Sequence, residues 1–155
     1  MNEEKKIEIL LEQYKLYVQM ADNVSARRTQ ANAFYITVLS GLLAVLSLAI
    51  QSVPTQAQNT VFLAVALLGI VLCYIWYVNI RSYQQLNTGK FAVIHEIEQS
   101  LPYAGYEREW KFLGEGKEGK RYLQLTRVEQ NVPLLLTIPY ILLLIYATYH
   151  ILKGL

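Results

Sequence analysis

Three stretches of the chain are apolar over about the length of a membrane-spanning helix. Two long intervals, 29–80 and 130–152, contain no Asp, Glu, Lys or Arg. The first interval holds two apolar runs, 34–50 and 60–80, which the polar sequence QSVPTQAQN separates. The second interval and the chain end supply a third run at 132–155. Because a bilayer core of roughly 30 Å requires about 20 apolar helical residues, the pattern predicts three transmembrane helices.

The residues before the first run predict one long amphipathic helix. No Pro or Gly occurs from residue 2 to residue 40, so a cytoplasmic helix over 1–33 should continue directly into the first span. Its apolar residues recur in alternating three- and four-residue steps, a heptad-like seam formed by Ile7, Leu10, Tyr14, Tyr17, Ala21 and Val24. This seam packs either against segment 81–131 of its own chain or against a neighbouring subunit, and the pattern favours neither.

Segment 81–131 predicts a small connector of helical and irregular structure, so the expected fold class is all-α. Its first part, 82–100, reads as a helix with apolar Leu86, Phe91, Ile94 and Ile97. A run rich in aromatic residues follows, with Tyr103, Tyr106, Trp110, Phe112 and Tyr122. Exposed aromatic clusters are uncommon on soluble surfaces, so we expect these side chains to be buried against the N-terminal helix of the same or a neighbouring chain.

The distribution of Lys and Arg predicts the orientation in a bacterial cytoplasmic (inner) membrane. Positive residues are concentrated in 1–33 and 81–131, whereas the loop 51–59 carries no charge. The positive-inside rule therefore puts the N-terminus and 81–131 in the cytoplasm, and 51–59 and the C-terminus outside. Aromatic residues near the inner ends of the first two spans are typical of an interfacial belt, namely Phe34, Tyr35, Trp76 and Tyr77.

One face of the first span carries a stripe of small and weakly polar residues. We call it the small-residue stripe, and its members are Ala33, Thr37, Ser40, Gly41, Ala44 and Ser47. The second span has a shorter small face, Ala66, Gly69 and Cys73. Helices in lipid associate by close approach at small residues and through hydroxyl hydrogen bonds. The stripe therefore predicts either a tight antiparallel hairpin of spans one and two or the lining of a wet path in an oligomer.

The third span contains two prolines. Pro133 lies at its entrance, and Pro139 lies inside it. An internal proline removes one helical hydrogen bond and clashes with the preceding turn, so a kink or local unwinding is expected at Pro139. A re-entrant path shielded by neighbouring helices is the alternative.

The sequence contains no convincing catalytic, metal-binding or cofactor-binding motif. Residues 114–120 match part of a phosphate-binding loop, but Arg121 stands where Ser or Thr would hold magnesium. The His95-Glu96 pair lacks the second His of a zinc site, and the lone Cys73 excludes an intrachain disulfide. Spans without acidic or basic residues argue against ion-coupled transport. We expect no enzyme activity, no cofactor, no metal and no nucleic-acid partner.

Three arginines flank the predicted spans on the cytoplasmic side. Arg27 and Arg28 precede the first span, and Arg81 follows the second. A basic residue at this level attracts anionic lipid headgroups by about 1 kcal/mol. We therefore expect Arg27, Arg28 and Arg81 to contact membrane lipids.

Three segments carry a resemblance to known membrane proteins. They are YKLYVQMADNVSARRTQANAFY (14–35), IRSYQQLNTGKFAVIHEIEQSLPYAGYEREWKFLGEG (80–116) and RYLQLTRVEQNVP (121–133). They resemble a family of small bacterial inner-membrane proteins of the RipA type, which implies a homo-octamer. The arginine pair before the first span and the run after the second are also similar to SLATT modules. These have two spans and are linked to nucleotide-signalling defence systems as membrane-perturbing effectors, and the third span departs from that plan.

Two hypotheses for function follow. The first is a homo-oligomeric ring in the cytoplasmic membrane, structural or pore-like rather than enzymatic, whose partners are further copies of the chain and membrane lipids. The alternative is a membrane-perturbing effector of a nucleotide-signalling defence system, which implies an unidentified signalling partner.

Overall fold

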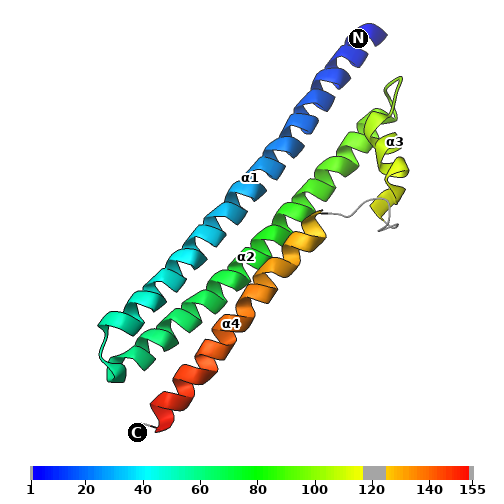
Figure 1. Cartoon of the computed structure of the whole chain (residues 1–155). Helices are drawn as coiled ribbons and strands as arrows, with labels where there is room; N and C mark the ends of the chain where they lie inside the picture. The colour runs from blue at the N-terminus through cyan, green and yellow to red at the C-terminus, as the bar shows by residue number, and fades with distance from the viewer. Residues whose placement is uncertain (1, 117–124, 154–155) are drawn as a thin grey trace. The chain divides into compact units, whose positions relative to one another are not determined.

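The fold is all-α, as the sequence predicts. The computed structural model describes residues 2–116 and 125–153. Within these residues it contains no strand, and its helices are α1 (Glu3–Ser52), α2 (Thr55–Glu98), α3 (Gly105–Phe112) and α4 (Leu125–Lys153), with a 3₁₀ turn at Gly114–Gly116 (Figure 1).

Helix α1 confirms the predicted continuity between the N-terminal amphipathic segment and the first span. It ends beside Pro54, because the residue before a proline is disfavoured in the helical conformation. The carbonyl groups at this end are satisfied by Gln58 of α2, whose side-chain amide donates to Ile50 O at 3.1 Å and to Val53 O at 2.8 Å. This capping joins α1 and α2 into a tight antiparallel connection.

Helix α2 is longer than the sequence pattern indicated. The predicted span 60–80 and most of the predicted helix 82–100 lie in one unbroken helix of 44 residues, which ends at Glu98. The change from apolar to polar composition after Ile80 does not interrupt it, because Arg, Gln, Leu and Lys all have good helix propensity.

Helix α4 runs without interruption through both prolines. The local unwinding expected at Pro139 is not observed, and the path is a single helix rather than a re-entrant one. The Thr137 hydroxyl, two residues before Pro139, adds a hydrogen bond to Pro133 O at 2.8 Å. Helix α4 therefore accommodates both prolines, although each of them lacks the N–H group of one helical hydrogen bond.

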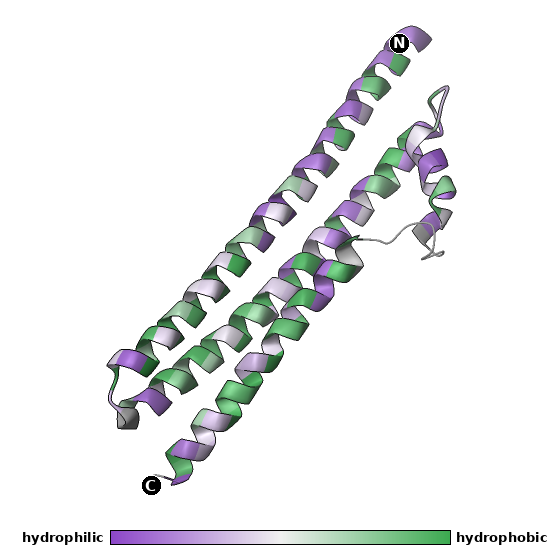
Figure 2. Cartoon of the chain, in the orientation of Figure 1, coloured by the Kyte–Doolittle hydropathy of each residue, from purple (hydrophilic) through white to green (hydrophobic). Residues whose placement is uncertain are grey.

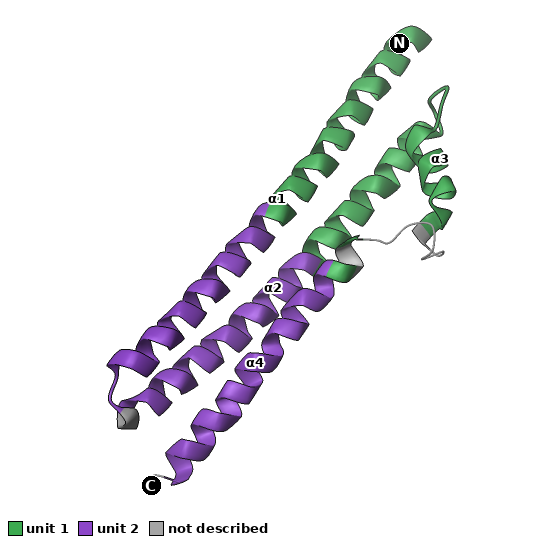
Figure 3. Cartoon of the chain, viewed as in Figure 1, with its two compact units in different colours: residues 1–29, 81–128 green, residues 30–80, 129–155 purple. Residues whose placement is uncertain are grey.

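The chain divides into two compact units, which we describe separately (Figure 3). Unit 1 comprises 1–29 and 81–128, and unit 2 comprises 30–80 and 129–155. Figure 2 shows apolar residues along the parts of the helices that form unit 2 and mixed polar residues along those of unit 1. The described residues include three helices long and apolar enough to cross a membrane, with bounds Glu3–Ser52, Ala57–Glu98 and Val128–Lys153.

The core of unit 2 is built around aromatic residues. Tyr35 of α1 stacks on Trp76 of α2, with ring centroids 5.7 Å apart and an interplanar angle of 11°. The Trp76 indole N–H donates to Asn32 Oδ1 at 2.8 Å. Both rings are buried inside unit 2, so Tyr35 and Trp76 contribute to packing between helices, and the interfacial belt stays a prediction. Phe34 is exposed, as a belt residue would be.

The small face of the second span packs against α4 rather than against α1. Ala66, Gly69 and Cys73 are buried, and a Cβ added at Gly69 would overlap the ring of Tyr140, with the ring Cγ only 2.6 Å away. The Tyr140 hydroxyl continues across to donate to Leu39 O at 3.4 Å. Gly69 thus lets an aromatic side chain of α4 cross α2 and reach α1.

The seam of the N-terminal helix packs against its own chain in unit 1. Tyr14 contacts Tyr106 of α3, with ring centroids 6.3 Å apart, and Ala21 and Val24 are buried. The Asn87 amide of α2 donates to Ser25 Oγ at 3.4 Å. The own-chain alternative therefore holds for this part of the seam.

Only some of the connector aromatics are buried in the single chain. Tyr106 and Trp110 are half-buried, whereas Tyr103 and Phe112 keep 65% and 76% of their surface exposed. Burial against the same chain is therefore not observed for Tyr103 and Phe112, whereas burial against a neighbouring chain stays a prediction. Tyr122 lies outside the described residues.

Candidate functional site

The small-residue stripe of α1 is exposed along its whole length. All six of its members, Ala33, Thr37, Ser40, Gly41, Ala44 and Ser47, are exposed. A Cβ added at Gly41 would meet no atom within 4 Å. The hairpin alternative for this stripe is therefore not observed.

A different face of α1 packs inside unit 2. It consists of larger side chains at three- and four-residue steps, Tyr35, Leu39, Leu42, Leu46 and Ala49. With about 100° between successive helical residues, this face and the stripe lie on roughly opposite sides of the helix. The fold thus uses the bulky face internally and leaves the small face exposed in the single chain.

The hydroxyl groups of the stripe add weak polarity without charge. The Thr37 hydroxyl donates to Ala33 O one turn earlier at 2.9 Å, a local bond that lets a hydroxyl lie in an apolar setting. Ser40 and Ser47 are exposed on the same face. The stripe can therefore be approached closely by another helix or be wetted by water.

The three arginines expected at the membrane surface do not occupy equivalent environments. All three belong to unit 1. Arg27 and Arg81 are exposed, whereas Arg28 is half-buried and lines a cavity. Lipid contact by these residues stays a prediction, but the fold distinguishes Arg28 from its neighbour in sequence.

Glu98, which the sequence analysis did not single out, organises unit 1. Its side chain is only 1% exposed. The Tyr14 hydroxyl donates to its Oε1 at 2.9 Å, the Tyr106 N–H donates to Oε1 at 2.8 Å, and the Glu107 N–H donates to Oε2 at 2.9 Å. Helix α3 has no side-chain cap from Ala104, the residue at its N-cap. Glu98 therefore caps α3 from the end of α2 and binds α1 through Tyr14.

Ionisation of Tyr14 should oppose folding of unit 1. Burial and the hydrogen bond to Glu98 raise the pKa of Tyr14 well above its usual range. A raised pKa means that the fold favours the neutral phenol, so the stability of unit 1 should be complete below about pH 10 and decline above it. An ultraviolet titration of tyrosinate should show a late-ionising phase whose amplitude Tyr14→Phe reduces by about one phenol; burial also raises the pKa of Tyr106, so part of the phase should remain. Tyr103 is exposed, and the control variant Tyr103→Phe should leave the late phase in place. A late phase that Tyr14→Phe does not change would contradict the assignment to Tyr14.

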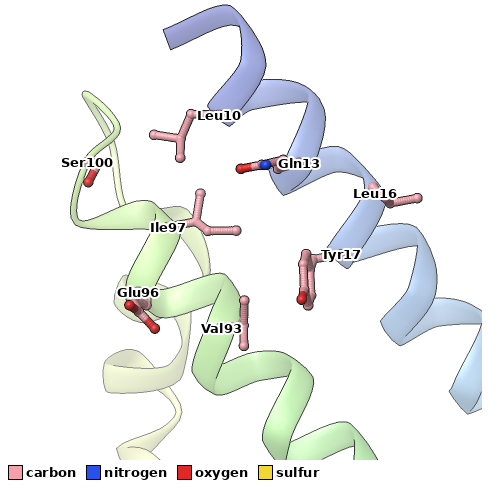
Figure 4. Close-up of a pocket in the computed structure, with 8 residues that line it drawn as sticks. All are labelled: Leu10, Gln13, Leu16, Tyr17, Val93, Glu96, Ile97 and Ser100. Carbon is pink, nitrogen blue, oxygen red and sulfur yellow. The ribbon is translucent and has the colours of Figure 1, made fainter. Parts of the chain in front are cut away.

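An open apolar groove lies between α1 and α2 in unit 1. Leu10 and Tyr17 of α1 face Val93 and Ile97 of α2, while Leu16 projects away from them (Figure 4). The groove has a volume of about 500 Å³. It contains no cluster suited to catalysis, and we interpret it as the incompletely filled end of the seam.

The described residues provide no metal site. Among them, no group of three or more His, Cys, Asp and Glu side chains could hold an ion. Of the loop 114–120, residues 117–120 lie outside the described residues, as does Arg121. His95 contacts the Phe91 ring, with centroids 6.4 Å apart.

The fold is that of an all-α membrane protein, with three long apolar helices and a polar helical unit. A family model for the octameric membrane protein family (8xMP) matches residues 11–149, and the chain belongs to that family. No curated protein and no solved structure matches the chain.

Proposed function

We propose that eight copies of this chain form a ring in the bacterial cytoplasmic membrane, and that the small-residue stripe of α1 is a contact between neighbouring copies. The observation that carries this proposal is that all six stripe residues are exposed in the single chain, in a chain of an octameric family. They are Ala33, Thr37, Ser40, Gly41, Ala44 and Ser47. The role is structural or pore-like rather than enzymatic.

The physical reason is the nature of helix association in lipid. Lipid tails solvate Leu and Ile as well as another helix does, so close backbone approach and hydroxyl bonds supply the attraction. A stripe centred on Gly41 and Ala44 permits that approach. In a cyclic ring each copy presents two different surfaces, so the stripe of one copy meets another face of the next.

The proposed orientation follows the charge distribution. The positive residues of unit 1 favour a cytoplasmic position, which leaves loop 51–59 and the C-terminus outside. The proposed partners are other copies of the chain, through the stripe, and membrane lipids, through the basic residues Arg27, Arg28 and Arg81.

The stripe can be tested by adding the same bulk at two exposed alanines. Ala44 belongs to the stripe, whereas Ala64 lies on α2 and is also exposed in the single chain. We expect Ala44→Leu to convert the octamer to smaller species in native mass spectrometry, because the added side chain prevents close approach. Ala64→Leu should remain octameric. An Ala44→Leu protein that stays octameric would overturn the proposed contact.

A second measurement separates a packed stripe from a wet one. In a Cys73→Ala background, Ser40→Cys should resist a charged, membrane-impermeant thiol reagent in the octamer, because the neighbouring helix covers it. Rapid reaction at that position would instead indicate a water-filled path along the stripe. The same reagent applied to Ser100→Cys, an exposed position of unit 1, is the positive control.

A further inference from the structure

Unit 1 contains a second cavity, formed by α1, α2, α3 and the first turn of α4. Its volume is about 640 Å³, within the range of sites that bind small molecules. The wall combines aromatic and polar side chains, and those that matter here are Ser25, Arg28, Asn87, Phe91, Glu109 and Trp110. We call it the Arg28 cavity.

The Arg28 cavity presents one permanent cation and nearby hydrogen-bond acceptors. Arg28 carries a planar guanidinium that stays charged at any physiological pH and suits phosphate oxygens. The Asn87 amide donates to Ser25, while its Oδ1 is buried and makes no hydrogen bond within the described part of the chain. The Glu109 carboxyl lies on the same lining. A ligand matching these groups would carry a phosphate and, a short distance away, a hydrogen-bond donor.

The position of the cavity in the sequence places it beside the proposed membrane surface. Arg28 precedes the first predicted span at 34–50 by about six helical residues, or ~9 Å. Gln84, also on the lining, follows the second span by about four residues, or ~6 Å. Headgroup layers extend roughly 5–8 Å beyond each side of the hydrocarbon core. One end of the cavity therefore falls near headgroup level.

We propose that the Arg28 cavity binds a phosphodiester whose terminal group donates hydrogen bonds, and that its source is a phospholipid headgroup. Arg28 binds the phosphate, and Asn87 Oδ1 accepts from the terminal ammonium or hydroxyl. Phe91 and Trp110 pack against the aliphatic part of the headgroup. This inference rests on the proposed placement of unit 1 at the bilayer surface, but it does not depend on the subunit contact at the stripe.

Lipid retention by the full-length protein tests the proposal. The purified protein is titrated with phosphatidylethanolamine, phosphatidylglycerol or phosphatidylcholine in detergent, and the bound lipid is counted by native mass spectrometry. Phosphatidylcholine keeps the phosphate but has no N–H or O–H donor. We expect about ten-fold tighter retention of the first two lipids, because a buried acceptor left unpaired is costly. Equal retention of all three would overturn the donor part of the proposal.

Two neighbouring arginines provide a matched control. Arg28→Gln should weaken retention of phosphatidylethanolamine about ten-fold. Arg27→Gln, one residue away and exposed, should weaken it by less than about two-fold, because water and salt screen an exposed charge. Equal losses in the two variants would show ordinary surface attraction and contradict the site. Asn87→Leu should abolish the preference over phosphatidylcholine while phosphate-dependent retention persists, and an unchanged preference would contradict the role of Asn87.

Two further readouts separate the possible outcomes. Soluble glycerophosphoethanolamine should not displace the lipid at equal concentration, and full displacement would identify a free phosphoester as the ligand and overturn the lipid source. The same spectra report subunit number. Loss of lipid from an intact octamer in Arg28→Gln supports the cavity, whereas a wild-type protein that binds lipid as a monomer would overturn only the proposed ring.

Discussion

Glu98→Gln should destabilise unit 1 by about 2–3 kcal/mol, because one hydrogen-bond acceptor of a buried cluster becomes a donor. The Gln amide can still accept from two of the three groups that now donate to Glu98. The third donor then faces the N–H group of the Gln amide and loses its acceptor. The Glu107 N–H is the donor most affected, because it is the one that pairs with Oε2. Hydrogen exchange of the first amides of α3 should accelerate about 30- to 150-fold, in line with that free energy.

Glu96→Gln is the matched control, because Glu96 lies two residues earlier on α2 and is exposed. It should leave exchange in α3 unchanged within about two-fold, since surface substitutions rarely exceed 0.5 kcal/mol. Tyr14→Phe should accelerate exchange by less than Glu98→Gln, because it removes one donor and leaves the cap of α3 in place. Exchange in α3 that is equally slow in Glu98→Gln and wild type would contradict the capping role.

Gly69→Ala should destabilise unit 2 by about 1–3 kcal/mol, the usual cost of overpacking a core. The added Cβ would overlap the ring of Tyr140, including its Cγ at 2.6 Å. The ring is held by its hydroxyl contact to Leu39 O, so α4 must shift away from α2. Unfolding in mixed micelles, followed by the fluorescence of Trp76, measures the loss.

Gly89→Ala on the same helix is the control, since a Cβ there would meet nothing within 4 Å. It should be neutral or stabilising by up to about 1 kcal/mol, because Ala has the higher helix propensity. The double variant Gly69→Ala with Tyr140→Leu should recover part of the loss by making room. A Gly69→Ala protein as stable as Gly89→Ala would contradict the close approach of α4.

The class of protein was determined by the sequence itself. Charge-free intervals at 29–80 and 130–152 define three apolar helices because the cost of placing charge in hydrocarbon is local to each residue. The absence of Pro and Gly from 2 to 40 likewise predicts a continuous α1, since helix propensity acts over neighbouring residues. Both features could be predicted without knowing which helices pack against each other.

The choice of packing faces came only with the tertiary structure. Both spans one and two carry small residues, and the sequence left open whether these faces pair with each other or whether the stripe of span one lines a wet path in an oligomer. The fold instead places Tyr140 of α4 against Gly69 and leaves the stripe of α1 exposed. Volume complementarity among three helices decides this, and no single segment contains that information.

The role of Glu98 illustrates the same limit within unit 1. In the sequence it is one of several acidic residues at the end of a polar helix, with no motif around it. Its donors come from Tyr14, Tyr106 and Glu107, which α1 and α3 bring to it only after folding. The sequence alone thus determined which segments are helical and which of them are apolar enough to cross a membrane. The tertiary structure decided which faces stay exposed in the single chain and which carboxyl holds unit 1 together, because both depend on contacts between residues far apart in the chain.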